Sequence, residues 1–251
     1  MRVALAVGGQ LRMSNDTLEL THKLWRDAFP TADFLFAVWR EDLAERPDMV
    51  EMLRRDGEVC IIDEYDIDYH PYDDNKDMYT KWNYQKKIAN PNPERHLHQT
   101  KQILNHNTLM KKYGSSYDVI IRTRFDSIVS PIQNFDNYLK DVHETGKVIS
   151  MQVMPEPNHK LKFFSVHGSG VTRNSMMVSD GGIIIHRSSW WDSELVETLH
   201  NNKRLLAAEF GWYQALVGNR DVEYVVYDGA SHLTRCVSKH DMTLTKEWMN
   251  Q

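Results

Sequence analysis

Short apolar runs recur through the first quarter of the chain, and amphipathic segments separate them. This alternation predicts β-α-β units and a mainly parallel sheet, because each helix carries the chain back to begin the next strand. Asn15 or Asp16 is the expected cap of the first helix, and Pro47 suits the first turn of the second. The predicted elements are strands over 2–7 (RVALAV), 33–39 (DFLFAVW) and 58–62 (EVCII), and helices over 16–29 and 47–55.

The alternation continues after one long interruption. Residues 63–95 are rich in Asp, Tyr and Asn. A polar loop of this length is typically a functional lid or a disordered segment, and its aromatic side chains suit a carbohydrate acceptor or an oligomer contact. With no internal repeat or linker, residues 1–251 are expected to form one domain. The further predicted elements are helices over 96–113 and 208–217, strands over 118–122, 147–154, 161–166 and 222–227, and a turn, strand and helix start over 180–191.

Composition limits the partners and the compartment. An apolar fraction of 41% in 251 residues is enough for a core, and no stretch reaches the roughly 18 apolar residues of a membrane span. The net charge of −5 argues against general nucleic-acid binding, which needs a basic surface. The first residues read as a strand and not as a signal peptide. Cys60 and Cys236 form no disulfide framework or zinc motif, so a reducing cytoplasm is the expected location.

The segment YDVIIRTRFDS (117–127) joins a buried strand to three ionisable side chains. If the strand stays extended, Arg122, Arg124 and Asp126 share one face, because side chains alternate along a strand. Ligands of α/β sheets lie beyond the carboxyl ends of the strands. Arginine suits phosphate oxygens, and an aspartate there can hold a divalent cation. The alternative is a structural Arg–Asp ion pair.

The first predicted strand ends in Gly8 and Gly9, followed by Gln10 and Arg12. Two glycines permit a tight turn and a close approach of the backbone to a ligand. Gln10 and Arg12 are then candidates for contact with a nucleotide base or phosphate. The dinucleotide fingerprint GxGxxG and the P-loop GxxxxGK[ST] are both missing from this sequence. A simple turn is the alternative reading of the two glycines.

Five segments, taken in order, resemble a group of small glycosyltransferases from capsule, lipopolysaccharide and viral glycan clusters. The resemblance implies a GT-A-type nucleotide-diphosphosugar transferase fold, with a mainly parallel mixed sheet flanked by helices. It also implies a UDP- or GDP-sugar donor, a carbohydrate acceptor, and Mn²⁺ or Mg²⁺. The usual DxD motif is replaced by Arg124-Phe125-Asp126, which offers one carboxylate. The segments are ALAVGGQLR, HQTKQILNHNTLMKKYG, YDVIIRTRFDS, DGGIIIHRSSWW and AAEFGWYQAL.

The resemblance also suggests roles for the site residues. Asp126 is the expected metal ligand, and His232, with His240 in reserve, is expected to complete the metal or phosphate site. For an inverting transfer, Asp180 or Glu209 would act as general base. Their structural alternatives are a turn aspartate bonded to its own backbone and a glutamate that stabilises a helix N-terminus. A retaining transfer needs no such base.

Two other classes of function fit the same residues. One is a non-catalytic module that binds a nucleotide or a glycan. The other is a metal-dependent phosphoryl-transfer enzyme, which is less favoured because two-metal sites need several carboxylates. The sequence leaves the donor, the acceptor, the stereochemistry and the oligomeric state open.

Overall fold

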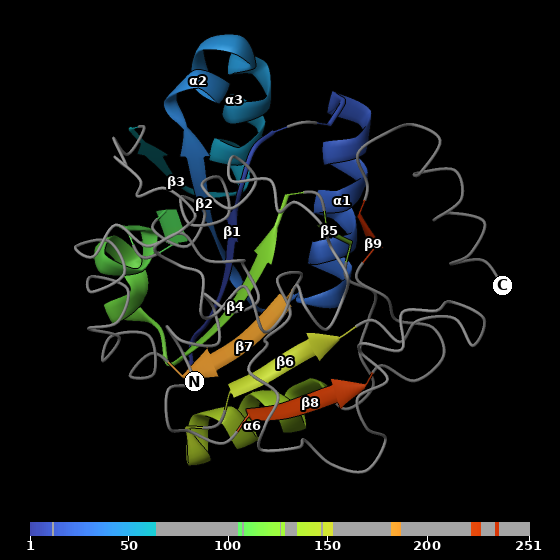
Figure 1. Cartoon of the computed structure of the whole chain (residues 1–251), viewed down its shortest axis with the longest axis vertical. Coiled ribbons are helices and arrows are strands. Elements are labelled where there is room, and N and C mark those ends of the chain that lie inside the picture. The colour runs from blue at the N-terminus through green and yellow to red at the C-terminus, as the bar shows by residue number, and fades with distance from the viewer. Residues whose placement is uncertain are drawn as a thin grey trace, which may run out of the picture.

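A computed structural model describes the N-terminal region and parts of the remaining chain. Its main feature is a seven-stranded sheet in the order β3-β2-β1-β4-β7-β6-β8 (Figure 1). The described residues are 1–11, 13–63, 105–106, 108–125, 127–128, 135–146, 148–152, 182–186, 222–226 and 234–235.

One strand of the seven runs against the others. β7 pairs antiparallel with both β4 and β6, whereas the remaining neighbours in the sheet pair in parallel. The predicted fold class, a mainly parallel mixed sheet flanked by helices, is therefore confirmed. The strands of this sheet are β1 Val3–Gly8, β2 Asp33–Trp39, β3 Gly57–Ile62, β4 Val119–Arg124, β6 Val148–Gln152, β7 Gly182–His186 and β8 Val222–Val226.

A second, two-stranded sheet pairs distant parts of the chain. β5 (Ser127–Ile128) follows β4 directly, and β9 (Thr234–Arg235) lies near the C-terminus. The two strands are antiparallel, with Ser127 opposite Arg235. This pairing ties the segment after the RTRFD motif to the last part of the chain.

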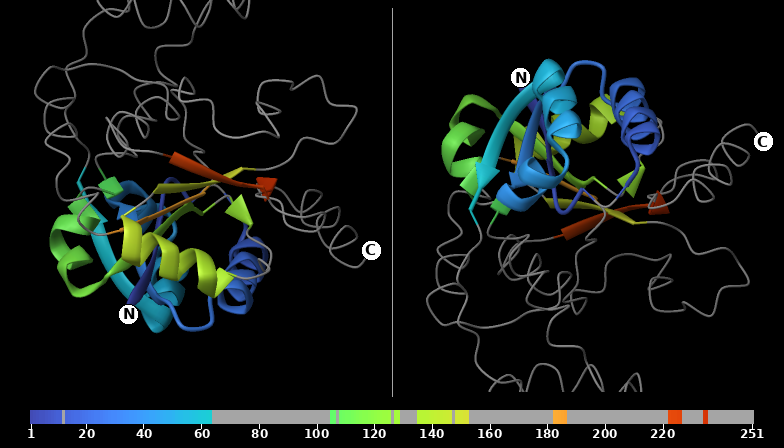
Figure 2. Two further views of the ribbon diagram at one scale, coloured as in Figure 1. Left: turned by 90° about the horizontal axis from the view of Figure 1, so that it is seen from below. Right: turned by 90° about the horizontal axis from the view of Figure 1, so that it is seen from above.

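Helices cover the sheet, and α1 and α6 lie on the same side of it (Figure 2). None of the helices in the described ranges is long and apolar enough to cross a lipid bilayer. Residues 105–106 and 108–113 are helical and lead into a short 3₁₀ turn, η2 (Gly114–Ser116). The other helices are α1 Asn15–Ala28, α2 Arg40–Glu45, α3 Pro47–Asp56 and α6 Phe135–Thr145.

The prediction of Asn15 or Asp16 as the cap of α1 is wrong. Ser14 is the N-cap, and its hydroxyl accepts a hydrogen bond from the backbone N–H of Thr17. Asn15 instead donates from its side-chain amide to Asp48 on α3. Ser, Asn and Asp stand side by side here and all favour caps, so sequence preference alone does not choose among them.

Two helices and the two short strands were not predicted. α6 has a recognisable signal, because Phe135, Leu139 and Val142 follow helical spacing and Gly146 ends the helix at φ 70°. α2 buries none of its residues fully and has no such stripe. The predicted strand at 161–166, the helices at 208–217 and after 186, and nearly all of the loop 63–95 lie outside the described residues.

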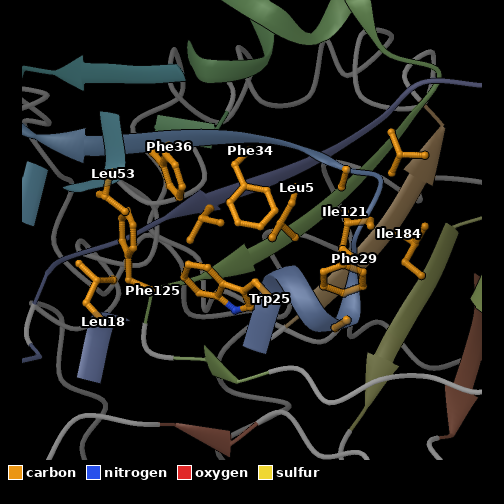
Figure 3. Packing of buried hydrophobic residues seen from close by; sticks show 14 of the residues in the cluster. Leu5, Leu18, Trp25, Phe29, Phe34, Phe36, Leu53, Ile121, Phe125 and Ile184 are labelled. Carbon is orange, nitrogen blue, oxygen red and sulfur yellow. The ribbon is translucent and has the colours of Figure 1, made fainter. Parts of the chain in front are cut away.

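The main core lies on one face of the sheet, between the strands and α1, α3 and α6 (Figure 3). Phe125, directly after β4, stacks on Phe36 with ring centroids 6.2 Å apart and lies 6.5 Å from Trp25. These aromatic contacts anchor the end of β4. The core side chains of β1 are Val3, Leu5 and Val7, which leaves its other face to small residues.

Replacing Phe125 by Ala is expected to destabilise the protein by roughly 3–5 kcal/mol, since a fully buried ring is removed from the aromatic cluster. Urea unfolding measures this change. Phe135→Ala, which removes a half-buried ring at the start of α6, is the control and should cost less. Equal costs for the two variants would contradict the anchoring role of Phe125.

Candidate functional site

Three strand ends meet at one end of the sheet, where β1 and β4 finish and β7 begins. This end of the sheet is named the ligand edge here. In the register of the parallel pair, Gly8 at the end of β1 lies opposite Arg124 at the end of β4. On the other side of β4, Gly182 at the start of β7 lies opposite Thr123. Ligands of α/β sheets bind at this end, and the side-by-side pairing of β1 and β4 (Figure 1) places Gly8 next to the RTR segment.

The sheet face opposite the main core is lined by small residues of β1. Ala4, Ala6 and Gly8 alternate with the core side chains. Arg122 pairs with Ala6 in the register and is fully buried, whereas Arg124, two residues on, is only partly buried. Burying a guanidinium is costly, so this position is unusual for a strand that serves packing alone. Arg124 is the arginine of the pair that reaches solvent.

A buried histidine covers Gly8. A Cβ added to Gly8 would lie 2.5 Å from Cε1 of His106, closer than side chains tolerate. His106 is fully buried, and its Nε2 lies 3.3 Å from the carbonyl oxygen of Thr123. Because a carbonyl only accepts, Nε2 carries the proton and donates. Gly9 has φ 124°, a backbone conformation that favours glycine. Both glycines are therefore required by the structure.

Asp42 on α2 lies beneath the turn that follows β1. Burial raises its pKa from the ordinary 3.8 to about 6, with a smaller contribution from Glu41, while the backbone N–H groups of Leu11 and Trp39 stabilise its charged form. Its Oδ2 has no hydrogen-bond partner among the described residues. A carboxyl group with this perturbed pKa beside a candidate ligand edge fits a functional region.

The predicted site residues divide into two groups. Gly8, Gly9, Gln10, Arg122 and Arg124 belong to the edge formed by β1 and β4, and Gln10 is exposed there. The others lie outside the described residues: Arg12, Asp126, Asp180, Glu209, His232 and His240.

Sequence analysis found no signal for His106, Asp42 or Arg46. The Arg46 guanidinium donates hydrogen bonds to the carbonyl oxygens of Leu11 and Met13. His106 sits in a helical segment with the pattern Asn-His-Asn, which gives no sign that its ring covers a glycine 98 positions earlier in the chain. Asp42 and Arg46 lie in and after a short helix with no apolar stripe. Only the folded chain brings these side chains to the edge.

Within the described residues, no group of three or more His, Cys, Asp or Glu side chains could hold a metal ion. The predicted metal ligands are outside these ranges, so the prediction remains open.

A cavity of about 530 Å³ lies elsewhere, between the end of α1 and the start of α6. This cavity is remote from the ligand edge. It is lined by Val3, Ala28, Phe29, Ile121, Phe135 and Leu139, among others.

Comparison with known sequences gives no relative. No family model matches this chain, and no curated protein sequence matches it. The evidence from known proteins is therefore structural.

Solved structures share the fold at low sequence identity. S. aureus TarS 1-349 superposes with a TM-score of 0.53 and 13% identity, over 99% of this chain and 64% of that chain. The 4-diphosphocytidyl-2C-methyl-D-erythritol synthase of Anaerococcus prevotii DSM 20548 gives 0.51 and 8%, over 100% and 99%. HddC of Yersinia pseudotuberculosis, complexed with GMP-PN, gives 0.51 and 8%, over 98% of both chains.

These likenesses define the fold. The chain spans less than two thirds of TarS, and 39% of a longer TarS structure. It has a GT-A-like α/β fold, the fold of nucleotidyl- and glycosyltransferase domains.

Gly8→Ala is expected to destabilise the protein by roughly 1–3 kcal/mol, because the new methyl group overlaps the His106 ring. In a His106→Ala background the same substitution should cost less, by about 1 kcal/mol or more, since the overlap is removed. Chemical denaturation of the four proteins measures the coupling. Gly146→Ala serves as a reference for backbone strain without overlap, because its Cβ would meet nothing within 4 Å while its φ of 70° disfavours a side chain. An equal cost of Gly8→Ala in both backgrounds would refute the contact.

Asp42→Asn should raise stability at pH 7 and change it little near pH 4. A carboxyl whose pKa is higher in the folded chain binds protons more tightly when folded, so its ionisation costs stability as pH rises from about 4 through about 6. The expected gain in unfolding free energy at pH 7 is roughly 1–2 kcal/mol. This is less than the full pKa shift would give, because water reaches part of the Asp42 carboxyl group.

Melting temperatures at the two pH values test this expectation. Asp48→Asn is the matched control of opposite sign, since the hydrogen bond from Asn15 lowers the pKa of Asp48. That variant should lose stability at pH 7. A loss of stability at pH 7 for Asp42→Asn would show that its charge is stabilising, against this account.

Proposed function

We propose that the protein is a glycosyltransferase that moves a sugar from a nucleotide-diphosphate sugar to a hydroxyl acceptor. The observation that carries the proposal is the meeting of Gly8, Arg124 and Gly182 at the ligand edge of a GT-A-like sheet. A positively charged strand end and a glycine turn are suited to a diphosphate.

The donor diphosphate would lie against the end of β1 and β4. Gly9 allows the backbone to approach the ligand closely, and the partly exposed Arg124 can reach phosphate oxygens. Arg122 lies deeper, two residues before Arg124 on the same face of β4, and adds positive charge behind the site. Gln10 and Arg12 are proposed to contact the base or the phosphates of a UDP- or GDP-sugar.

Asp126 and His232 are proposed to hold Mn²⁺ or Mg²⁺, which would neutralise the leaving diphosphate. Support comes from the pairing of β5 with β9, because β5 begins directly after Asp126 in the sequence and β9 begins two residues after His232. Arg122 and Arg124 precede Asp126 by four and two residues in the sequence, and they would share in neutralising the charge of the diphosphate.

The general base of an inverting transfer would be Asp180, with Glu209 as the second candidate. Asp180 is two residues before Gly182, and Gly182 lies opposite Thr123 at the ligand edge. The acceptor is proposed to be a carbohydrate, held in part by the aromatic loop 63–95. With such an acceptor, a role in polysaccharide biosynthesis is proposed.

Nucleotidyl transfer is the second candidate. Two nearly full-length structural matches favour it: a diphosphocytidyl-methylerythritol synthase, and HddC complexed with GMP-PN. A nucleotidyltransferase would join a nucleotide to a phosphorylated substrate and release pyrophosphate, whereas a glycosyltransferase releases a nucleoside diphosphate.

A thermal-shift panel of nucleotide sugars, with and without Mn²⁺, tests the proposal first. A ligand that binds only the folded protein raises the melting temperature, and a concentration 100 times Kd adds roughly 2.7 kcal/mol of stability. We expect a UDP- or GDP-sugar to give the largest shift and Mn²⁺ to increase it. Asp126→Ala should lose the Mn²⁺-dependent part, whereas Asp136→Ala, an exposed residue of α6, should not.

Product analysis with a donor labelled in the sugar then separates the classes. Labelled sugar on an acceptor, or free labelled sugar, supports glycosyl transfer. Pyrophosphate released from a nucleoside triphosphate supports nucleotidyl transfer. A donor that binds without any turnover supports a non-catalytic binding module and contradicts the proposal.

A further inference from the structure

Arg46, at the corner between α2 and α3, binds the turn that follows β1. Its guanidinium donates one hydrogen bond to the carbonyl oxygen of Leu11 at 3.2 Å and another to that of Met13 at 2.5 Å. The turn passes beside α2 and α3 on its way to α1 (Figure 1). A planar guanidinium that bridges two carbonyl groups fixes their relative position better than a single contact would.

Asp42 supports the same turn through the backbone of Leu11 as well. Its carboxylate accepts from the backbone N–H of Leu11, whereas Arg46 binds the carbonyl group of that residue. The two side chains are one helical turn apart, and the backbone N–H of Arg46 donates to the carbonyl oxygen of Asp42 at 2.8 Å. They form one unit, named here the α2 clamp.

The turn needs such support from outside. Gly9 lies at φ 124° and can adopt many backbone conformations, so the sequence of the turn does not by itself select the one observed. Gln10, next to it, is exposed at the ligand edge. Ordering this turn before a ligand arrives reduces the entropy that binding must overcome.

We propose that the α2 clamp, Asp42 and Arg46, is a positioning device that fixes the backbone at Gly9 and Gln10 for the nucleotide diphosphate of the donor. This inference rests on the proposed function, because it concerns the same ligand edge. The clamp residues act through the turn and take no part in the chemistry.

The chain contains a matched arginine at the opposite end of the sheet. Arg26, near the end of α1, donates to the carbonyl oxygens of Ala32 at 3.3 Å and Asp56 at 2.8 Å. Arg26→Met therefore removes two arginine–carbonyl hydrogen bonds, as Arg46→Met does, but away from the ligand edge. A role in stability alone predicts similar behaviour for both variants.

The test uses the full-length protein with UDP and GDP as probes. Isothermal titration calorimetry, at a temperature where every variant is folded, gives Kd for wild type, Arg46→Met, Asp42→Ala and Arg26→Met. Hydrogen exchange of a peptide covering residues 9–13 reports on the turn itself. We expect about tenfold weaker binding and faster exchange for Arg46→Met and Asp42→Ala, with Arg26→Met close to wild type in both. Arg46→Lys, which keeps one donor group, should fall between.

Failure of the clamp and failure of the donor site give different results. Wild type that binds its nucleotide, together with an Arg46→Met variant that binds equally well, would overturn the clamp and leave the proposed function standing. Equal losses in Arg46→Met and Arg26→Met would also overturn it, as a general effect on folding. Wild type that binds neither UDP nor GDP would remove the proposed donor site, and with it the role of the clamp.

Discussion

The parallel pairing of β1 with β4 determines the rest of this structure. Its register sets Gly8 against Arg124 and Ala6 against Arg122, and it fixes which face of each strand meets the main core. Large side chains fill one face, and Phe125 locks the end of β4 into the aromatic cluster there. The other face keeps small residues on β1, which leaves room for His106 and a buried guanidinium. A shift of one residue would exchange these two faces.

Patterns local in the sequence predicted the strands and their order of appearance. Apolar runs at 33–39 and 58–62 matched β2 and β3 closely, and the predicted strand at 118–122 overlaps β4. Contacts between distant segments could not be predicted in this way. Arg46 binds the carbonyl oxygen of Leu11 across 35 positions, and no periodicity encodes such a bond. The missed helix α6 is different, since the spacing of its apolar residues was available.

The ligand edge contains ionisable side chains whose burial costs folding free energy. Arg122 is a buried cation, and Asp42 is a carboxyl whose pKa burial raises to about 6. In the proposed function, Arg122 supplies positive charge behind an anion site, and Asp42 acts only through the backbone of the turn that follows β1. The GT-A-like fold alone does not decide between glycosyl and nucleotidyl transfer, because the chemistry depends on side chains that meet the substrate.

A crystal structure of the protein with its preferred nucleotide sugar and Mn²⁺ is the most direct test of the central claim. The account predicts the diphosphate at the carboxyl ends of β1 and β4, within hydrogen-bond distance of the Gly9 backbone or of the Arg124 guanidinium. A nucleotide bound instead in the cavity between α1 and α6, with the β1–β4 edge open to solvent, would contradict it.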